Sequence, residues 1–324
     1  MTVIGIDLGG TKVAAAWLGD DGLSHGVEHP TKLGSSEELL DQLTSVVNET
    51  RGDSEIDAVG IGVPSIVESA SGRVVSSTNI PLKDVPLRAV LGERLGVPVF
   101  VDNDATVAAL AEAHDESLTL VSQNLVMLTI GTGVGGGIVI GGRIYRGATG
   151  GAGELGHTIV GLDLAGAVPK PMSFAQPGSL EWVASGHSLD RLAEQAANLH
   201  PESPLGRLQA EGKPVLGPEV VAAAERGDTA ATRIVEIWGQ HVGVGVANAI
   251  NTFDPEEVVI GGGAARAGEL LLGPARQVAA NYVFPGLWGH TNIRLARFGA
   301  NAGVVGAALL AVHELEQPSI RVRG

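Results

Sequence analysis

Residues 125–157 read LVMLTIGTGVGGGIVIGGRIYRGATGGAGELGH, and 12 of these 33 residues are glycine. An apolar run, Leu125–Ile130, stops at Gly131-Thr132-Gly133, and a second apolar run, Gly137–Ile140, follows. Two short strands around a glycine turn expose backbone N–H groups, as an anion such as a polyphosphate requires. An ordinary tight hairpin explains one such segment equally well. The rest of the chain therefore has to decide between a hairpin and an anion site.

The same pattern occurs near the N-terminus, and a third glycine turn follows later. The apolar run Ile4–Leu8, the turn Gly9–Lys12 and the run Val13–Leu18 mirror the segment above, which indicates an internal duplication. Gly261-Gly262-Gly263 follows another apolar strand, and we expect a helix to start near Ala264, where its N-terminus favours anions. None of the turns matches the P-loop or the dinucleotide fingerprint. Together they predict a nucleotide held by a different architecture.

The amino-acid composition is typical of a globular protein, and the net charge limits the kinds of partner that the protein can bind. The 324 residues are enough for about two domains of ~150 residues each. Hydrophobic residues make up 44% and aromatic residues 3%, so the core must be aliphatic. The net charge of −15 argues against nucleic-acid and membrane partners, which require a basic face. The absence of cysteine rules out disulfides and thiolate metal sites. There is no signal segment and no run of membrane-spanning length, so we expect a cytoplasmic protein.

Strands and helices alternate along the chain, which predicts an α/β fold with mixed sheets. Besides the runs above, strands are expected at 56–63, 73–82, 97–101, 258–260 and 293–297. Helices are expected from Ser35 and at 87–95, 105–113, 180–184, 189–198, 218–225, 229–251 and 302–314. The polar segment 115–123 predicts a boundary between a small domain, residues 1–117 with 302–324, and a large domain, residues 118–301. Two related halves would place a ligand in the cleft between them.

Five motifs, in this order along the chain, resemble those of the ROK sugar kinases, in the actin/hexokinase/heat-shock-70 ATPase superfamily. They are DLGGTK (Asp7–Lys12), DNDATVAAL (Asp102–Leu110), IGTGVGGGI (Ile130–Ile138), GELGH (Gly153–His157) and VIGGG (Val259–Gly263). The resemblance spans residues 4 to about 306. It implies two ribonuclease-H-like domains, ATP and a hexose in the cleft, and a homodimer.

Asp104 is the expected general base. Phosphoryl transfer to a hydroxyl needs a carboxylate that orients the hydroxyl and accepts its proton. Asp104 follows a strand and starts a helix, whose dipole favours the ionised carboxyl group. A helix-capping aspartate is the alternative, although Asp102 or Asn103 could equally provide the cap. The resemblance places the base at Asp104.

The resemblance also assigns the nucleotide and its metal. Asp7 would position Mg²⁺ on the phosphates, through water, whereas Lys12 could point at phosphate or into solvent. The ATP-binding residues would be those of the three turns, namely Gly9, Gly10, Thr11 and Lys12; Gly131, Thr132 and Gly133; and Gly261, Gly262 and Gly263.

The residues expected to contact the sugar carry amide, carboxylate or imidazole groups, which make the directional hydrogen bonds that distinguish hydroxyl patterns. By resemblance they are Asn79, Asn103, Asp104, Glu154, His157 and Glu181. From the residues alone, a packed or capping histidine is the better interpretation of His157.

The chain departs from the family's pattern after His157. The family's CxCGxxGC segment binds zinc, but its cysteine positions are Met172, Phe174 and Ser179 here. Because the chain has no cysteine, we expect no zinc site, and apolar packing by Met172, Phe174, Pro171 and Pro177 would hold the loop. This departure leaves the identity of the sugar substrate undecided, since family members without zinc include kinases for modified sugars such as kanosamine.

The sequence therefore predicts an ATP- and Mg²⁺-dependent hexose kinase acting on the 6-hydroxyl of glucose or of a glucose-like aminosugar. A sugar-sensing transcriptional regulator would carry a helix-turn-helix before the first strand, and the strongly negative charge also argues against it. A non-catalytic sugar-binding protein is the remaining alternative, against which Asp7, Asp104 and the three glycine turns count.

Overall fold

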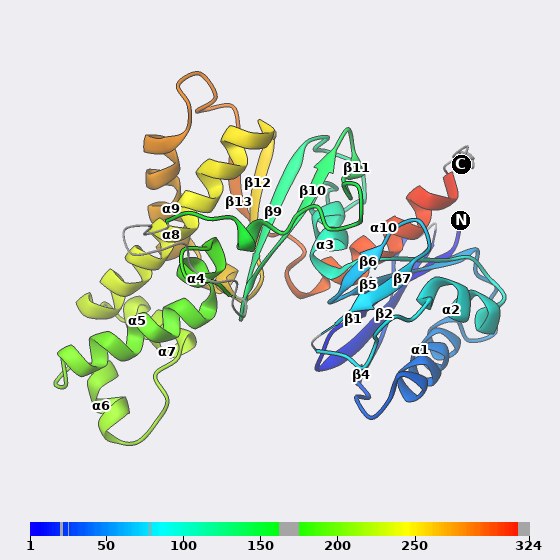
Figure 1. Cartoon of the computed structure of the whole chain (residues 1–324), viewed down its shortest axis with the longest axis horizontal. Helices are drawn as coiled ribbons and strands as arrows, with labels where there is room; N and C mark the ends of the chain where they lie inside the picture. The colour runs from blue at the N-terminus through cyan, green and yellow to red at the C-terminus, as the bar shows by residue number, and fades with distance from the viewer. Residues whose placement is uncertain (20–21, 25, 78, 162–174, 317–324) are drawn as a thin grey trace. The chain divides into compact units, whose positions relative to one another are not determined.

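The computed structural model describes residues 1–19, 22–24, 26–77, 79–161 and 175–316, and they form two compact units (Figure 1). Unit 1 comprises residues 1–125 and 137–153 and the chain from Arg297 onward. Unit 2 comprises residues 126–136 and 154–296. Within the described residues, no helix is both long enough and apolar enough to cross a membrane.

Unit 1 is built on a mixed sheet with the strand order β3-β2-β1-β5-β8, in which β4 also pairs with β2. β1 is antiparallel to β2 and parallel to β5, and β5 is parallel to β8. The strands are β1 (Val3–Leu8), β2 (Lys12–Gly19), β3 (Gly22–Leu23), β4 (Val27–Pro30), β5 (Ala58–Val63) and β8 (Val99–Asn103). A separate hairpin consists of β6 (Ile66–Glu68) and β7 (Arg73–Ser76).

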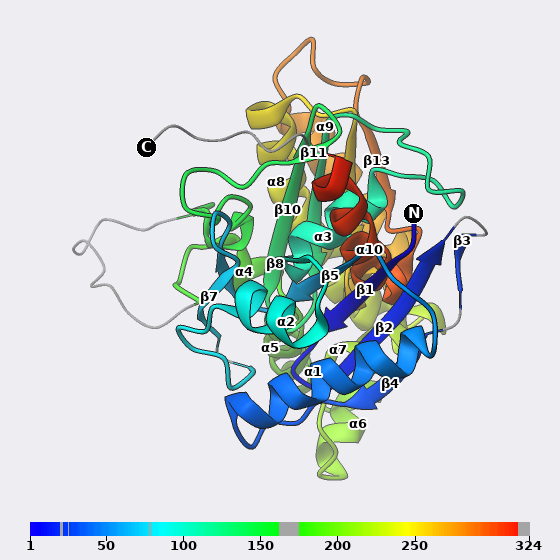
Figure 2. The ribbon, with the colours of Figure 1, turned by 90° about the vertical axis from the view of Figure 1, so that its right-hand side faces the viewer.

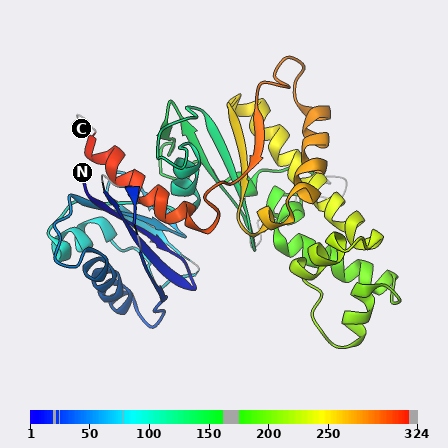
Figure 3. The ribbon, with the colours of Figure 1, turned by 180° about the vertical axis from the view of Figure 1, so that it is seen from behind.

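Helices cover both faces of this sheet. They are α1 (Ser36–Arg51), α2 (Leu87–Leu95), α3 (Asp104–Glu112) and α10 (Ala302–Glu316). Alternate residues of β1 point to opposite faces, so that Ile4 packs in one core with Leu39 of α1, and Val3 packs with Ala308 of α10. Figures 2 and 3 show α1 and α10 on opposite sides of the strands. Gly60 of β5 lets α10 approach closely, since a Cβ there would overlap the Ala307 carbonyl.

The second sheet has the order β11-β10-β9-β12-β13, and this repeats the order of the first. Its strands are β9 (Leu125–Ile130), β10 (Val134–Ile140), β11 (Arg143–Ile144), β12 (Glu257–Gly261) and β13 (Asn292–Leu295). In each sheet, two consecutive strands joined by a glycine turn lie beside a strand from much later in the chain. The structure thus confirms the α/β class with mixed sheets.

Helices make up most of unit 2. They are α4 (Leu180–Ala184), α5 (Gly186–Leu199), α6 (Pro204–Ala210), α7 (Gly217–Glu225), α8 (Thr229–Phe253) and α9 (Glu269–Tyr282). Figure 1 shows α8 and α9 side by side next to β12. Aliphatic residues of β9, α8 and α9, such as Leu128, Val246 and Leu271, share one buried core. This is the aliphatic interior that the scarcity of aromatic residues predicts.

Two expected elements differ from the structure, and one helix of the structure was not expected. The strand expected at 73–82 ends at Ser76, because the chain turns away before Pro81. The helix expected near Ala264 is a short 3₁₀ helix, Gly263–Ala267, and α9 begins only after Gly268, whose φ of 56° interrupts the helix. Helix α6 was not expected, although Pro204 at its start and the capping Ser203 are typical helix signals.

Candidate active site

Two of the three glycine turns lie against each other in unit 2. The turn between β9 and β10 is closed by the Gly131 N–H, which donates to the Gly133 carbonyl at 3.0 Å. Gly262, at the end of β12, has a φ of 76°, and a Cβ there would lie 2.5 Å from the carbonyl oxygen of Ile130. Only glycine tolerates this conformation and this approach. The two turns therefore present their backbone groups at one place.

The N-terminal end of α5 lies against the Gly131–Gly133 turn. The backbone N–H of Gly186 donates to the carbonyl of Gly131 at 2.7 Å, and a side chain at Gly186 would collide with that carbonyl. Ser185 caps α5 by accepting from the N–H of Ser188. The N-terminus of α5 is thus fixed beside Gly131 and Thr132, where its dipole favours negative charge.

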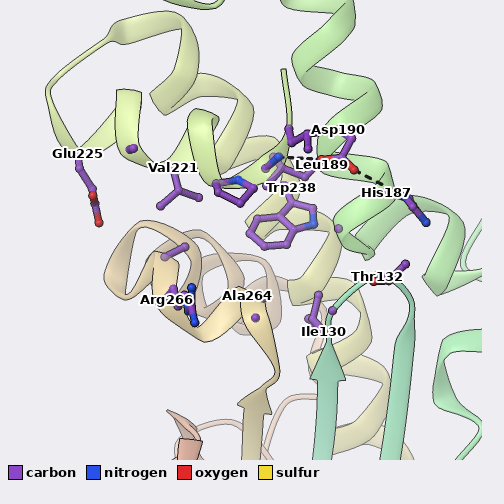
Figure 4. A pocket seen from close by; sticks show the side chains of 18 residues that line it. Ile130, Thr132, His187, Leu189, Asp190, Val221, Glu225, Trp238, Ala264 and Arg266 are labelled. Carbon is purple, nitrogen blue, oxygen red and sulfur yellow. Dashed lines mark hydrogen bonds and ion pairs between the residues drawn. The ribbon is translucent and has the colours of Figure 1, made fainter. Parts of the chain in front are cut away.

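A cavity of about 560 Å³ opens beside these turns, entirely within unit 2 (Figure 4). Its interior is mostly apolar and its polar groups are few, as is usual for a site that binds a small molecule. The apolar lining includes Leu189, Leu216, Val221, Trp238 and Ala264, and the polar lining includes Thr132, His187, Asp190, Glu225 and Arg266.

Hydrogen bonds hold the walls of this cavity in place. The indole N–H of Trp238 donates to the carbonyl of Ala184 at 2.9 Å, which fixes the ring on α8. The Oδ1 atom of Asp190 accepts from the N–H of Gly217 at 2.7 Å, and its Oδ2 atom lies 3.6 Å from Nδ1 of His187. Asp190 therefore ties the start of α7 to α5. The result is a preformed, mostly apolar cavity that ends at two turns of bare backbone.

The sequence did not point to most of these wall residues. Neither His187 nor Trp238 belongs to a motif that predicts binding. Trp238 is buried, and it also lines the cavity. A weak signal was present in the glycines at the first positions of α5 and α7, Gly186 and Gly217, because both begin a helix beside the cavity.

Three of the expected sugar-binding residues also lie in unit 2. Glu154 directly precedes a 3₁₀ turn, Leu155–His157, and His157 ends it, with His157 Nε2 and Glu154 Oε2 3.6 Å apart. Glu181, in the first turn of α4, accepts a hydrogen bond from the N–H of Val134 at 2.9 Å. Glu181 is therefore attached to the Gly131–Gly133 turn.

The ends of the loop that follows His157 are joined by backbone hydrogen bonds. The Val160 N–H donates to the Gly178 carbonyl at 2.8 Å, and the Leu180 N–H donates to the Thr158 carbonyl at 2.9 Å. Ser179, one of the family's cysteine positions, instead caps α4 by accepting from the N–H of Trp182. The expected packing by Pro171, Met172 and Phe174 lies outside the described residues.

In unit 1, Asn103 caps α3 and Asp104 is the first residue of that helix. The Oδ1 atom of Asn103 accepts from the N–H groups of Ala105 at 2.9 Å and Thr106 at 3.1 Å. The Oδ1 atom of Asp104 accepts from the N–H of Ala105 at 2.8 Å. The cap is thus provided by the neighbour, and the Asp104 carboxylate sits at the helix N-terminus, where the dipole stabilises its charge.

Asp7, at the end of β1, points to the face that α10 covers. A Cβ at Gly303 would lie within 2.8 Å of both carboxylate oxygens of Asp7, so the start of α10 is pressed against this group. Burial raises the pKa of Asp7 above 3.8, and the charge of Lys12 opposes that rise. A buried carboxylate with a raised pKa suits a site that receives a cation.

The first glycine turn lies beside Asn79. The Gly9 N–H donates to the Lys12 carbonyl at 2.9 Å, and a Cβ at Gly10 would lie 3.1 Å from Cβ of Asn79. The side chain of Asn79 is exposed. Lys12 Nζ forms an exposed ion pair with Glu28 at 2.6 Å. Among the described residues, no three His, Cys, Asp or Glu side chains are grouped as metal ligands.

Comparison with known proteins agrees with this architecture. The sequence model of the ROK family matches residues 3–314. A glucokinase of Halalkalibacterium halodurans is 34% identical, and the match covers 95% of this chain and 94% of that protein. The crystal structure of a ROK glucokinase from Streptomyces griseus in complex with glucose and AMPPNP has a TM-score of 0.79 and 32% identity, over 97% of this chain and 100% of that one. A putative xylose repressor of Caldicellulosiruptor is 31% identical, over 88% of this chain and 71% of the repressor.

Proposed function

Because the chain belongs to the ROK family, we propose that it is an ATP-dependent hexose kinase that phosphorylates the 6-hydroxyl group of glucose. The observation that carries this proposal is the cavity of about 560 Å³ that ends at the Gly131–Gly133 and Gly261–Gly263 turns. Glucokinases that match almost the whole chain support the same activity.

In this proposal the cavity holds the adenine and ribose of ATP. Trp238, Val221 and Ala264 would cover the faces of the base, and the polar groups of Thr132 and Asp190 would orient it. The phosphates would then lie on bare backbone N–H groups, which approach anionic oxygens more closely than side chains could. The Gly9–Lys12 turn would contribute further N–H groups, and Lys12 would have to exchange Glu28 for a phosphate oxygen to take part.

Asp104 would be the general base. The sugar's 6-hydroxyl oxygen attacks the γ-phosphorus, the new O–P bond forms, and the bond from that phosphorus to the bridging oxygen breaks, so that ADP leaves with the electron pair. The hydroxyl proton passes to the Asp104 carboxylate, which hydrogen-bonds it from the start and accepts it late. Asp104 lies at the N-terminus of α3, where the helix dipole favours the ionised form that can accept the proton.

The carboxylate of Asp7 is a group that fits Mg²⁺. It is a hard oxygen donor, and its buried negative charge gains from a nearby cation. A bound Mg²⁺ would neutralise charge on the β- and γ-phosphate oxygens. Asp7 would orient that ion through water molecules, as Mg²⁺ keeps much of its hydration shell.

The sugar would be recognised by Asn79, Asn103, Glu154, His157 and Glu181 together with Asp104. Their carboxylate, amide and imidazole groups suit a ring of hydroxyl groups, and the Glu154–His157 pair is close enough to share one hydroxyl. A glucose-like aminosugar is the second candidate. It is favoured by the cysteine-free loop between His157 and Glu181, because that loop connects two of the proposed contacts.

A substrate panel tests the proposal. The protein is incubated with ATP, Mg²⁺ and, one at a time, glucose, mannose, N-acetylglucosamine, glucosamine and kanosamine, and ADP release is followed. We expect sugar-dependent ADP release and a 6-phosphate product identified by ³¹P and ¹H NMR. Sugar binding without ADP release from any of these sugars would instead support a non-catalytic sugar-binding protein.

A further inference from the structure

Asp102 is a buried carboxylate directly before the two residues that start α3. Its side chain is among the most buried charged groups of the described chain, and both of its oxygens have partners. Oδ1 accepts from the backbone N–H of Asn103 at 2.9 Å, and Oδ2 accepts from Nε of Arg146 at 2.6 Å. Neither Asp102 nor Arg146 has a role in the proposed chemistry.

Arg146 connects three distant parts of unit 1. It follows β11, it binds Asp102 at the end of β8, and its Nη2 atom donates to Oε1 of Glu314 on α10 at 2.7 Å. The backbone carbonyl of Arg146 also accepts from the N–H of Ala152 at 3.1 Å, which closes the segment that leads to Glu154. Asp102 is buried, whereas Arg146 and Glu314 are partly exposed, and the planar guanidinium uses two separate donors for the two carboxylates.

We propose that Arg146 is a positioning residue for the phosphoryl transfer, acting on Asn103 and Asp104 through the carboxylate of Asp102. The proposal rests on the proposed kinase function. The connection is continuous, because Arg146 orients Asp102, Asp102 fixes the N–H of Asn103, and Asn103 caps the helix that begins at Asp104. Displacing a reacting group by about 1 Å can cost about 10²-fold in rate, so this support matters for the base.

The charges around Asp102 make the effect dependent on pH. Burial raises the pKa of Asp102, and the charge of Arg146 and its hydrogen bond oppose that rise. Glu314, on α10, raises the pKa further, whereas the guanidinium of Arg88, on α2, is a second positive charge nearby. Without Arg146 the Oδ2 atom of Asp102 would lose its partner, and the carboxyl group would take up a proton at a higher pH.

The test compares Arg146→Met with Glu314→Gln, which is the matched control because a glutamine oxygen can still accept from Arg146 while Asp102 keeps its own bond. We expect Arg146→Met to lower kcat about 10- to 100-fold, with KM for ATP changed less than about twofold. We also expect the acid limb of the kcat–pH profile to move to higher pH. Glu314→Gln should stay within about threefold of wild type in kcat, with its acid limb not moved upward.

Further variants keep the test decisive. If Arg146→Met does not fold, as judged by its thermal melt, Arg146→Lys replaces it and should show the same shifts with smaller size. Adding Asp102→Asn to Arg146→Met removes the unpaired buried charge, so the double variant should lose the shifted acid limb. An unchanged kcat, or a lower kcat with an unmoved acid limb, would overturn the proposal. A wild-type protein without sugar-dependent ADP release would overturn the proposed function and this inference together, whereas an active wild type matched by Arg146→Met would overturn this inference alone.

Discussion

The Oε2 atom of Glu181 accepts a hydrogen bond of 2.9 Å from the backbone N–H of Val134, directly after the Gly131–Gly133 turn. A Cβ at Gly133 would collide with the same carboxylate. One side chain that we propose to contact the sugar therefore also shapes a turn that we propose to contact ATP. Glu181 thus has two proposed roles, and different substitutions can test them separately.

We expect Glu181→Ala to raise KM for both substrates about 10-fold or more, because it removes the proposed sugar contact and leaves the Val134 N–H without its acceptor. Glu181→Gln keeps an acceptor oxygen for Val134, so it should restore KM for ATP to near wild type while KM for the sugar stays high. Steady-state kinetics with each substrate varied in turn measure both constants. A sugar KM that Glu181→Gln fully restores would contradict the sugar role.

Filling the cavity of unit 2 should affect ATP alone. Val221 lines its apolar wall, and Val221→Trp would occupy the space proposed for adenine. We expect KM for ATP to rise at least 10-fold, which corresponds to about 1.4 kcal/mol, with little change in KM for the sugar. The control is Val121→Trp at an exposed position outside the cavity. Equal effects of the two variants on KM for ATP would place the nucleotide elsewhere.

Asp7→Asn should lower the activity of the protein without lowering its stability. Burial raises the pKa of the Asp7 carboxyl group in the folded protein, so the stability that its protonated form contributes is present below pH 3.8 and is lost as pH rises through the folded-state pKa. At pH 7 the asparagine variant should therefore melt at an equal or higher temperature than wild type without Mg²⁺, and the difference should shrink as pH falls toward 3.8.

The same variant should lose most of its Mg²⁺-dependent turnover. Thermal melts from pH 4 to 8 and kinetics over a range of Mg²⁺ concentrations measure the two effects. A variant that is clearly less stable than wild type at pH 7 would mean that the charge of Asp7 is well compensated in the fold.

Removal of metal should leave the fold intact. The loop after His157 is joined at its base by backbone hydrogen bonds between Thr158, Val160, Gly178 and Leu180, and the chain has no cysteine to bind zinc. We expect treatment with EDTA to abolish turnover without lowering the melting temperature, and Mg²⁺ alone to restore full activity. Metal analysis that found one zinc per chain would contradict this account of the loop.

The sequence predicted best those features that depend on neighbouring residues. The strand–glycine–strand units, the start of α1 at Ser35 and the bounds of α2 all follow from local patterns, and the structure confirms them. The duplication was visible because the same pattern of apolar run, glycine turn and apolar run recurs near Gly9 and Gly131. The match of the whole chain to the ROK family confirms the resemblance.

Features that depend on distant packing were not predictable. The cavity is closed by Trp238, Val221 and Leu189, which come from three helices and share no sequence pattern. Arg146 lies 44 residues from Asp102 and 168 from Glu314 in the chain. The prediction of a helix starting near Ala264 was wrong, because the periodicity of apolar residues does not show that a glycine interrupts the helix. The expected domain boundaries, the homodimer and the roles of the site residues stay predictions.

The most direct test of the central claim is the turnover of Asp104→Asn with its best sugar at saturating ATP and Mg²⁺. Asparagine keeps the size of the side chain and can still hydrogen-bond the hydroxyl group, but it cannot accept the proton. We predict that kcat falls about 10²- to 10⁴-fold while the sugar still binds, as measured by isothermal titration calorimetry. A wild-type kcat in Asp104→Asn would contradict the assignment of the base and with it the proposed mechanism.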